Sequence, residues 1–309
     1  MFTFGGLVGY PQIKLPPWFG GQLGIAGSAN PEGLRMVPQG EVWYVDPSFP
    51  SASDGNDGAD PRAPLSTIQE AIDRVNATIN WSLTPPYKGT PTIVIAPGKY
   101  AEALTPPYYC RIIGLGLATG NTDDWCVNIE PLAGSPLAGT GLGCHWFNIR
   151  FTGLVAAPVL DLDVMNSCVI EQCAIVDGNP GLATVGIDTE NANSSQILRC
   201  RFVGNTNPLT RGIRSTGNFF GCLVEDCHIE AITAGIDLSG AALEGNSLIK
   251  HNVIMATTTG IDDSVVGGTA VIDNWISAAD AINHADMTRV IGNHVMNGAV
   301  GAVESAGTD

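Results

Sequence analysis

Short runs in which apolar and polar residues alternate recur along the second half of the chain. Seven of them hold one register: each begins with Cys, Ser or Thr and ends in an aliphatic or aromatic residue. They are CHWFNIRF (144–151), CVIEQCAI (168–175), SQILRCRF (195–202), CLVEDCHI (222–229), SLIKHNVI (247–254), TAVIDNWI (269–276) and TRVIGNHV (288–295). Their starts are 24, 27, 27, 25, 22 and 19 residues apart, which indicates an internal repeat.

Two series of equivalent positions follow from this register. Five residues after the start of six segments stand Cys173, Cys200, Cys227, Asn252, Asn274 and Asn293. A Gly-Ile motif between the segments gives the second series, Ile187, Ile213, Ile236 and Ile261. Both series share one slightly variable period, so each is predicted to stack as a ladder with a spacing of about 4.8 Å.

The repeat units have the pattern of short strands joined by turns. Each unit holds two or three alternating runs bounded by Gly, Asn and Asp. No unit shows the i, i+3, i+4, i+7 pattern over 11 residues, which argues against a helical repeat. One unit is too small to bury its own apolar residues, whereas stacked units share a continuous core. The pattern therefore predicts an all-β solenoid of parallel strands.

The units resemble the coils of a right-handed parallel β-helix of the pectate-lyase type. YVDPSFPSASDGNDGADPRAPLSTIQEAID (44–73), followed by TIVIAPGKYAE (92–102), resembles the opening of many such proteins. The resemblance implies a single-stranded, right-handed parallel β-helix over residues 41–309, with a short capping helix at its N-terminal end. This scaffold serves enzymes, adhesins and virus particles alike, so it predicts fold better than activity.

Residues 65–79 fit the capping helix. Ser66 and Gln69 have the spacing of a capping box. One face of this helix is apolar and carries Leu65, Ile68, Ile72 and Val75. We expect the helix to shield an edge strand that would otherwise recruit other strands.

Residues 1–40 differ from the rest, because they are rich in Gly and Pro and carry few charges. The prolines forbid a long helix, and no periodic apolar pattern would give this segment its own core. Aromatic side chains on an extended segment are typical of contacts with another protein. They are Phe2, Phe4, Tyr10, Trp18 and Phe19. We expect an arm that docks on a particle; the alternative is that it packs along its own solenoid.

Composition and charge narrow the function classes. The 14 basic and 30 acidic residues give a net charge of −16, which disfavours nucleic-acid binding because phosphate backbones are repelled. No apolar run is long enough for a transmembrane helix and no secretory signal is recognisable, so no membrane partner is expected. The eight cysteines have neither disulfide-scaffold density nor zinc-motif spacing, and are interpreted as reduced, stacked thiols.

The weak catalytic candidates are the acids directly after the Gly-Ile motif, Asp188, Asp237 and Asp262, with Asp161 in the preceding coil. Carboxylates on neighbouring coils would lie about 5 Å apart, and those two coils apart about 10 Å, separations similar to those of glycosidases. Arg214 falls between Asp188 and Asp237 and would neutralise such a pair. The alternative interpretation is a solvated polar face.

Adjacent acids such as Glu225 and Asp226 raise the question of a calcium site. Consecutive strand residues point to opposite faces, so adjacency does not bring such side chains together, and no Asp-rich loop motif supports a site. The resemblance implies a calcium-binding Asp set and a catalytic Arg or Lys, but this sequence offers no residues that match them. No metal, cofactor or assigned catalytic residue is therefore predicted.

The aromatic arm, the capped solenoid and the lack of a catalytic motif favour a structural protein of a tailed phage virion. Because the sequence stops at its last coil, we expect a capsid decoration (cement) protein rather than a tailspike. The resemblance implies a homotrimer, assembled in the bacterial cytoplasm, that contacts the major capsid protein or another virion protein.

The alternative is a tailspike, or a protein that binds or degrades polysaccharide as a glycosidase or lyase. Such a protein would contact a host-surface glycan along its coils and, if an enzyme, would be a polysaccharide depolymerase. Trp125, Trp146 and Trp275 would supply stacking platforms, although packing in the core or a turn is the more ordinary role for each.

Overall fold

The computed structural model describes residues 41–78, 90–116, 126–178, 185–204, 208–241, 243–264, 268–284 and 288–296. The predicted arm, residues 1–40, lies outside them. The described residues form 26 β-strands and one α-helix, and every pairing between these strands is parallel. The predicted all-β parallel solenoid is confirmed.

The strand pairings define three faces. Face 1 is a ten-stranded sheet: β1 (Val42–Val45), β2 (Thr92–Ile95), β4 (Arg111–Gly114), β7 (His145–Phe147), β10 (Val169–Glu171), β13 (Gln196–Leu198), β16 (Leu223–Glu225), β19 (Leu248–Lys250), β22 (Ala270–Ile272) and β25 (Arg289–Ile291). Face 2 comprises β3 (Gly98–Tyr100), β5 (Val127–Ile129), β8 (Arg150–Gly153), β11 (Ala174–Asp177), β14 (Arg201–Gly204), the first half of β17 (His228–Asp237), β20 (Val253–Ala256), β23 (Trp275–Ser277) and β26 (His294–Val295). Face 3 comprises β6 (Leu137–Leu142), β9 (Leu160–Asn166), β12 (Val185–Asn193), β15 (Leu209–Phe220), the second half of β17, β18 (Leu243–Gly245), β21 (Thr259–Asp263) and β24 (Asp280–His284).

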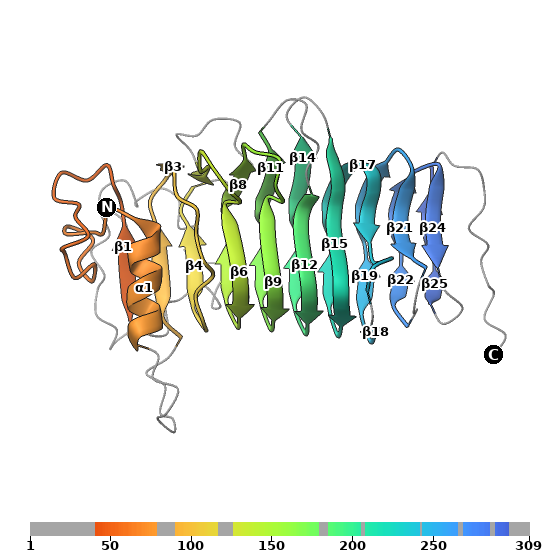
Figure 1. Cartoon of the computed structure of the whole chain (residues 1–309), viewed down its shortest axis with the longest axis horizontal. Coiled ribbons are helices and arrows are strands. Elements are labelled where there is room, and N and C mark those ends of the chain that lie inside the picture. The colour runs from red at the N-terminus through yellow and green to blue at the C-terminus, as the bar shows by residue number, and fades with distance from the viewer. Residues whose placement is uncertain are drawn as a thin grey trace, which may run out of the picture. The chain divides into compact units, whose positions relative to one another are not determined.

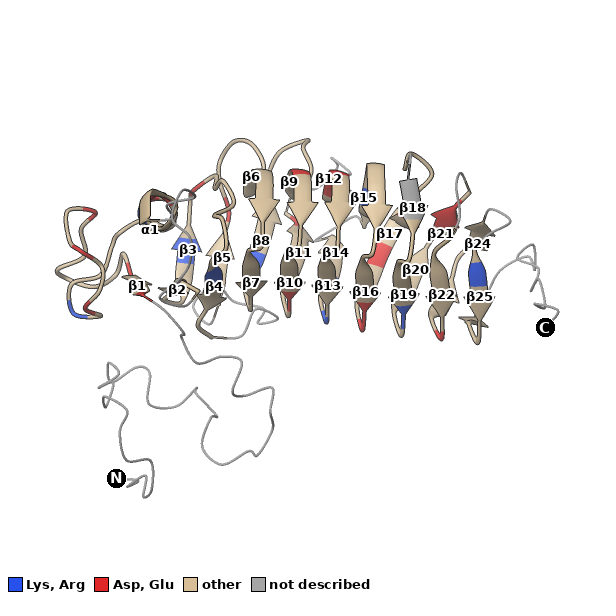
Figure 2. Cartoon of the chain, turned by 90° about the horizontal axis from the view of Figure 1, so that it is seen from below, with Lys and Arg blue, Asp and Glu red and all other residues tan. Residues whose placement is uncertain are grey.

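The coils follow one another along a single axis. In Figure 1 the strands of face 3 stand side by side from β6 through β9, β12 and β15 to β21 and β24, in the order of the sequence. Figure 2 shows the strands of face 1 in a second row, from β1 to β25. Equivalent residues of successive coils are therefore hydrogen-bonded neighbours.

Two corners of the solenoid turn on residues with a left-handed backbone in several of the coils. Between faces 1 and 2, φ lies between 53° and 65° at Asn148, Gln172, Arg199, Asp226, His251, Asp273 and Gly292. Between faces 3 and 1, φ lies between 50° and 63° at Gly143, Ser167, Ser194, Gly221 and Asn246. For a residue other than Gly this conformation costs about 1–2 kcal/mol, so the fold must offset it at each corner.

The offset comes from the buried side chain that follows each corner residue. Cys200 Sγ donates to the carbonyl two residues before it at 3.3 Å and to the middle carbonyl of β10 at 3.4 Å. Asn274 Nδ2 donates to the two equivalent carbonyls, at 3.1 and 3.0 Å. Cys and Asn can thus occupy the same ladder because both supply a donor to equivalent backbone acceptors. The structure places all six residues of this series at the same corner: Cys173, Cys200, Cys227, Asn252, Asn274 and Asn293.

The Gly-Ile series forms an apolar stack inside face 3. Its members lie opposite one another on neighbouring strands and are fully buried; they are Ile187, Ile213, Ile236 and Ile261. The glycine before each is required by close approach, since a Cβ on Gly212 would lie 2.5 Å from the carbonyl oxygen of Gly235. All eight cysteines are buried, and none of them forms a disulfide.

Helix α1 (Ile68–Thr78) lies within the predicted range and buries Ile68, Ala71, Ile72 and Val75. The capping box predicted at Ser66 and Gln69 is wrong by one residue. Thr67 Oγ1 accepts the hydrogen bond from the backbone N–H of Glu70 at 3.3 Å, and Gln69 Nε2 donates to Asp73 instead.

Two distant carboxylates complete the cap. Asp54 accepts the backbone N–H groups of Ser66 and Thr67, each at 2.9 Å, and Glu102 accepts those of the next two residues, each at 3.0 Å. Burial opposes ionisation of Asp54, but the hydrogen bonds from Ser66 and Thr67 outweigh it and lower its pKa. Burial raises the pKa of Glu102 despite its two backbone donors.

Candidate functional site

The acids proposed as catalytic candidates lie in one outward row on face 3. Strand pairing places the members of this row, the face 3 ladder, opposite one another on successive coils in the order Asp161, Asp188, Arg214, Asp237, Asp262 and Asn283. Each follows the buried Leu or Ile of its coil, so period-two alternation points its side chain outward. Arg214 does stand between Asp188 and Asp237, as the sequence register indicates.

Arg214 binds the carboxylate of Asp188 through two of its guanidinium nitrogens. Its Nε donates to Asp188 Oδ1 at 2.7 Å and its Nη2 donates to Oδ2. This hydrogen bonding is the main cause of a raised pKa of the Arg214 guanidinium. One coil earlier, burial raises the pKa of Asp161, and the charges of Asp188 and Asp163 add to it. Asp188 is thus bound in a fork-shaped ion pair with Arg214.

Asp237 contradicts the expectation of a solvated polar face, because it is only 6% exposed. Arg211 Nε donates to its Oδ2, and the backbone N–H and Oγ of Ser239 donate to its Oδ1 at 3.1 and 2.6 Å. Arg211 lies opposite Ala234 of β17, three residues before Asp237, just after a register shift in this pairing. Asp237→Asn would therefore break a buried ion pair, although position alone suggests a harmless change.

The third candidate, Asp262, accepts a hydrogen bond at 3.1 Å from Asn283 Nδ2 on the next coil. A glycosidase needs one protonated and one ionised carboxylate facing a shared space. Here a cation lies between the first two acids, and an amide binds the third. The face 3 ladder is chemically suited to holding coils together.

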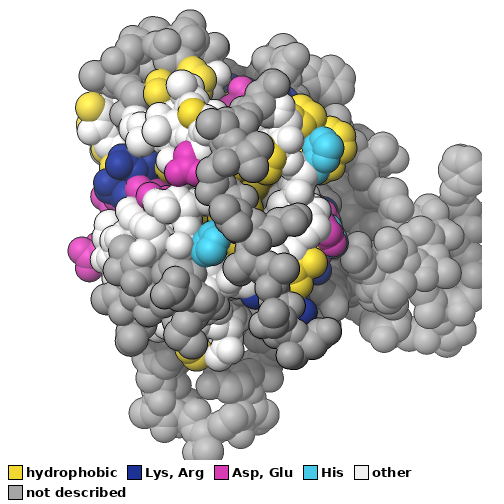
Figure 3. Space-filling model, turned by 90° about the vertical axis from the view of Figure 1, so that its right-hand side faces the viewer, with side chains coloured by type: hydrophobic (Ala, Val, Ile, Leu, Met, Phe, Trp, Pro, Cys, Tyr) yellow, Lys and Arg dark blue, Asp and Glu magenta, His cyan; other side chains and the backbone are white. Residues whose placement is uncertain are grey.

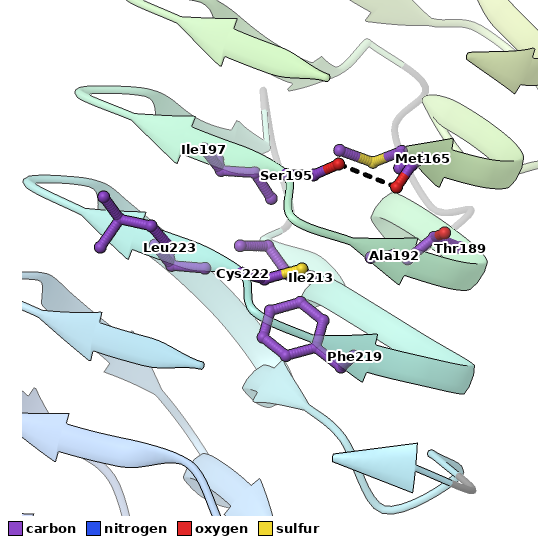
Figure 4. A pocket seen from close by; sticks show the side chains of 10 residues that line it. Met165, Thr189, Ala192, Ser195, Ile197, Ile213, Phe219, Cys222 and Leu223 are labelled. Carbon is purple, nitrogen blue, oxygen red and sulfur yellow. Dashed lines mark hydrogen bonds between the residues drawn. The ribbon is translucent and has the colours of Figure 1, made fainter. Parts of the chain in front are cut away.

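A small cavity lies inside the solenoid between β12 and β15 (Figure 4). Its volume is about 10 Å³, room for one water molecule, and apolar side chains such as Ile213 and Phe219 line it. Ser195 Oγ, at its wall, donates to the backbone carbonyl of Met165 at 2.8 Å. The hydroxyl of Thr189 reaches the same wall without a hydrogen-bond partner in the described part of the chain. This space admits no substrate.

The three tryptophans considered as glycan platforms differ in where they lie. Trp146 is buried in the core, packed edge-on against Phe151, which is the more ordinary role and not that of a platform. Trp125 lies outside the described residues. Trp275 is 53% exposed on face 2 and lies against the ring of His294, with 4.7 Å between ring centroids.

Other apolar side chains are exposed near Trp275 on the last coils. They are Val253, Met255, Val295 and Met296. Figure 3, which looks onto the C-terminal end, shows hydrophobic side chains beside histidine there. An exposed aromatic among aliphatic neighbours is a surface suited to contact with another molecule.

A cluster that the sequence interpretation missed lies at the corner between faces 1 and 2. Ligand atoms of Glu225, Asp226 and His251 all lie within 4.8 Å of one another. The expectation that Glu225 and Asp226 point apart is wrong, because Asp226 is a left-handed corner residue (φ 55°) and not a strand residue. Aligning the fourth place after the start of each segment would have shown it, since successive units carry Asp226, His251 and Asp273 there.

The predicted particle-binding residues all lie outside the described part of the chain: Phe2, Phe4, Tyr10, Trp18 and Phe19. Within the described part, no helix combines the length and the apolar character needed to cross a bilayer. The chain matches no protein-family model, and no curated protein matches it either. Fold and geometry therefore define its class, a parallel β-solenoid with polar ladders at its corners and on one face.

Proposed function

We propose that the protein is a structural component of a tailed phage virion, a capsid decoration protein whose residues 1–40 bind the particle and whose solenoid projects from it. The supporting observation is that two acids of the face 3 ladder form ion pairs with arginines of a neighbouring coil. Asp188 is bound by Arg214, and Asp237 by Arg211 and Ser239. Side chains committed to holding coils together suit a rigid scaffold better than a catalyst.

The finer features belong to the same proposal. Right-handed winding is supported by the strong preference of parallel crossover connections for that hand. Helix α1 packs against β1 and β2, which supports its role as a cap on that end of the sheet. We propose a homotrimer, by resemblance to particle proteins of this fold, with the major capsid protein or another virion protein as partner. The net charge of −16 argues against nucleic acid as a partner.

Deletion of residues 1–40 tests the docking role. We expect the shortened protein to melt near the temperature of the full chain and to be missing from purified particles. The double change Trp18→Ala with Phe19→Ala should weaken incorporation without affecting folding, since aromatic anchors supply much of an interface's binding energy. Asp262→Asn in the full chain is the matched control and should be incorporated normally.

Mass spectrometry of purified virions measures incorporation of each variant. Normal incorporation of the shortened protein would refute the docking role, and complete absence of the full chain from virions would refute the proposed function. If the shortened protein aggregates, the arm packs on its own coils instead.

Glycan binding is the second candidate, and the exposed Trp275 on its His294 neighbour favours it. Sugar rings stack on exposed aromatic faces, and a coil surface offers a row of contacts to an extended chain. Incubation with host polysaccharide, followed by assays of binding and of new reducing ends or unsaturated sugars, tests it. We expect Trp275→Ala to abolish any binding; equal binding by this variant and the wild type would place the glycan elsewhere.

A further inference from the structure

The corner cluster of Glu225, Asp226 and His251 combines one imidazole and two carboxylates on two adjacent coils. His251 Nδ1 lies 3.7 Å from Glu225 Oε1 and 3.9 Å from Asp226 Oδ1. Both distances are too long for hydrogen bonds. With metal bonds of 2.0–2.2 Å, two donors on a tetrahedral ion lie about 3.4 Å apart, so small side-chain rotations would close this set on one ion.

The fold places these donors independently of any attraction between them. Asp226 and His251 are equivalent corner residues of successive coils, with φ of 55° and 57°. The buried ladder residues that follow, Cys227 and Asn252, hold both corners, since Asn252 Oδ1 accepts the backbone N–H of Cys227 at 2.9 Å. The solenoid therefore sets the spacing of the two backbone positions that carry the Asp226 and His251 donors.

The other nitrogen of the ring has a carboxylate of its own. Asp273, the corner residue of the next coil, places Oδ2 3.9 Å from His251 Nε2. Metal-binding histidines generally present their second nitrogen to a carboxylate or carbonyl, which fixes the tautomer and makes the first nitrogen a better donor. Along this corner, two ligand positions, Asp226 and His251, are followed by Asp273, whose carboxylate would support the imidazole.

We propose that Glu225, Asp226 and His251 Nδ1 bind a zinc ion, with Asp273 supporting the imidazole and water completing the coordination. Zinc suits the set, because it accepts nitrogen and carboxylate donors at low coordination number. Calcium takes six to eight oxygens and is disfavoured by an imidazole. The ion would cross-link the coils that contain β16 and β19.

The ammonium group of Lys250 would compete with the zinc ion for the carboxylate of Glu225. Its Nζ lies 2.7 Å from Glu225 Oε1, the oxygen that also faces His251. Zinc must displace that ammonium or take the second carboxylate oxygen. Removing the ammonium while keeping the length of the side chain, as in Lys250→Met, should therefore raise zinc affinity.

Calorimetric titration of the full chain with zinc chloride near neutral pH tests the site. We expect binding by the wild type, loss of that binding in His251→Asn and Asp226→Asn, and about 10- to 100-fold weaker binding in Asp273→Asn. Asn is chosen because it tolerates the left-handed backbone of these corners. Asp262→Asn on face 3 is the matched control and should bind as the wild type does.

A second readout keeps folding and binding apart. Cobalt(II) in place of zinc should give visible absorption bands of a low-coordinate nitrogen and oxygen site in the wild type and in Lys250→Met, and none in His251→Asn. Circular dichroism should be unchanged in every variant. Undiminished zinc binding by His251→Asn, no zinc binding by the wild type, or equal affinity for calcium would each overturn the proposal. None of these outcomes bears on attachment to a virion.

Discussion

Replacing Asn274 by Ala should be one of the most damaging single polar-to-Ala changes in the solenoid. The Asn274 carboxamide is fully buried and takes part in five hydrogen bonds, with two backbone carbonyls, with Asn293 Oδ1 and with the backbone N–H and Nδ2 of Asn252. Three consecutive coils meet at this one side chain, so its loss affects each of them.

The magnitude follows from the groups that lose their partners. Asn252 Nδ2 keeps its bond to the carbonyl of Val224 at 3.0 Å, but the backbone N–H of Asn252 has only Asn274 Oδ1 as its acceptor among the described contacts. A buried donor without a partner costs about 1–3 kcal/mol, and the lost bonds and the vacated volume add to this. We expect Asn274→Ala to lower the free energy of unfolding by about 3–5 kcal/mol.

Asn274→Cys is the matched control, because Cys occupies the same ladder at Cys200 and donates to the two equivalent carbonyls. It should cost less than Ala does, since Cys keeps a donor for those carbonyls and loses only the acceptor for Asn252 and the bond to Asn293 Oδ1. Asn283→Ala, on an exposed side chain with one hydrogen bond, should cost at most about 0.5 kcal/mol. Urea denaturation followed by far-ultraviolet circular dichroism measures all three, and hydrogen exchange localises the loss to β19, β22 and β25. An unchanged urea midpoint for Asn274→Ala, or an equal loss for Cys and Ala, would refute this account of the ladder.

Five further outcomes are expected. Ile236→Asp should prevent folding, because it places an unpaired charge within the buried isoleucine stack; a wild-type melting curve would show the strand register to be wrong. Thr189→Val should raise the melting temperature, since it removes a buried hydroxyl that has no partner in the described structure, whereas Ser195→Ala should lower stability by about 1–3 kcal/mol. The lowered pKa of Asp54 contributes stability above pH 3.8 that is lost as pH falls through the folded value, so the wild type's advantage over Asp54→Asn in urea midpoint should shrink below pH 3.8 and not above it. Light scattering on the purified chain should report three copies, and a stable monomer at micromolar concentration would count against the trimer.

The ladders could be predicted because strand residues alternate strictly between two faces. Once Ile187 and Ile213 are aligned, the inward or outward direction of the residues next to them is fixed up to the register shift after Thr189, and pairing follows from parallel stacking. Asp188 opposite Arg214 is one such consequence. The class of fold and the face 3 ladder were therefore within reach of the sequence alone.

The corners could not be predicted in the same way. Gln172, Arg199, Asp226 and His251 share no side-chain chemistry, because the position demands a left-handed backbone and leaves the side chain in solvent. The rule that neighbours point apart fails there, which is why the Glu225 cluster was missed. Nor does any local pattern mark the register shift between β15 and β17, or the burial of Asp237.

The cap of α1 shows a third limit. Asp54 and Glu102 reach the first turn of the helix from 12 and 34 residues away in the sequence. A capping box is a local pattern, and the Ser66 to Gln69 spacing satisfied it formally. The competing carboxylates, which lie close only after the chain has folded, decided the actual arrangement with Thr67 as the local cap.

The replacement of Cys by Asn along the corner between faces 1 and 2 also determines which coils can be damaged by oxidation. Cys173, Cys200 and Cys227 occupy inner coils, where burial keeps an oxidant from the sulfur. Toward the last described coils, where Val295 and Met296 are already exposed, the same bonds are made by carboxamides, which peroxide does not attack. Fraying of that end would therefore expose no oxidisable ladder residue, and the corner bonds could re-form without chemical damage.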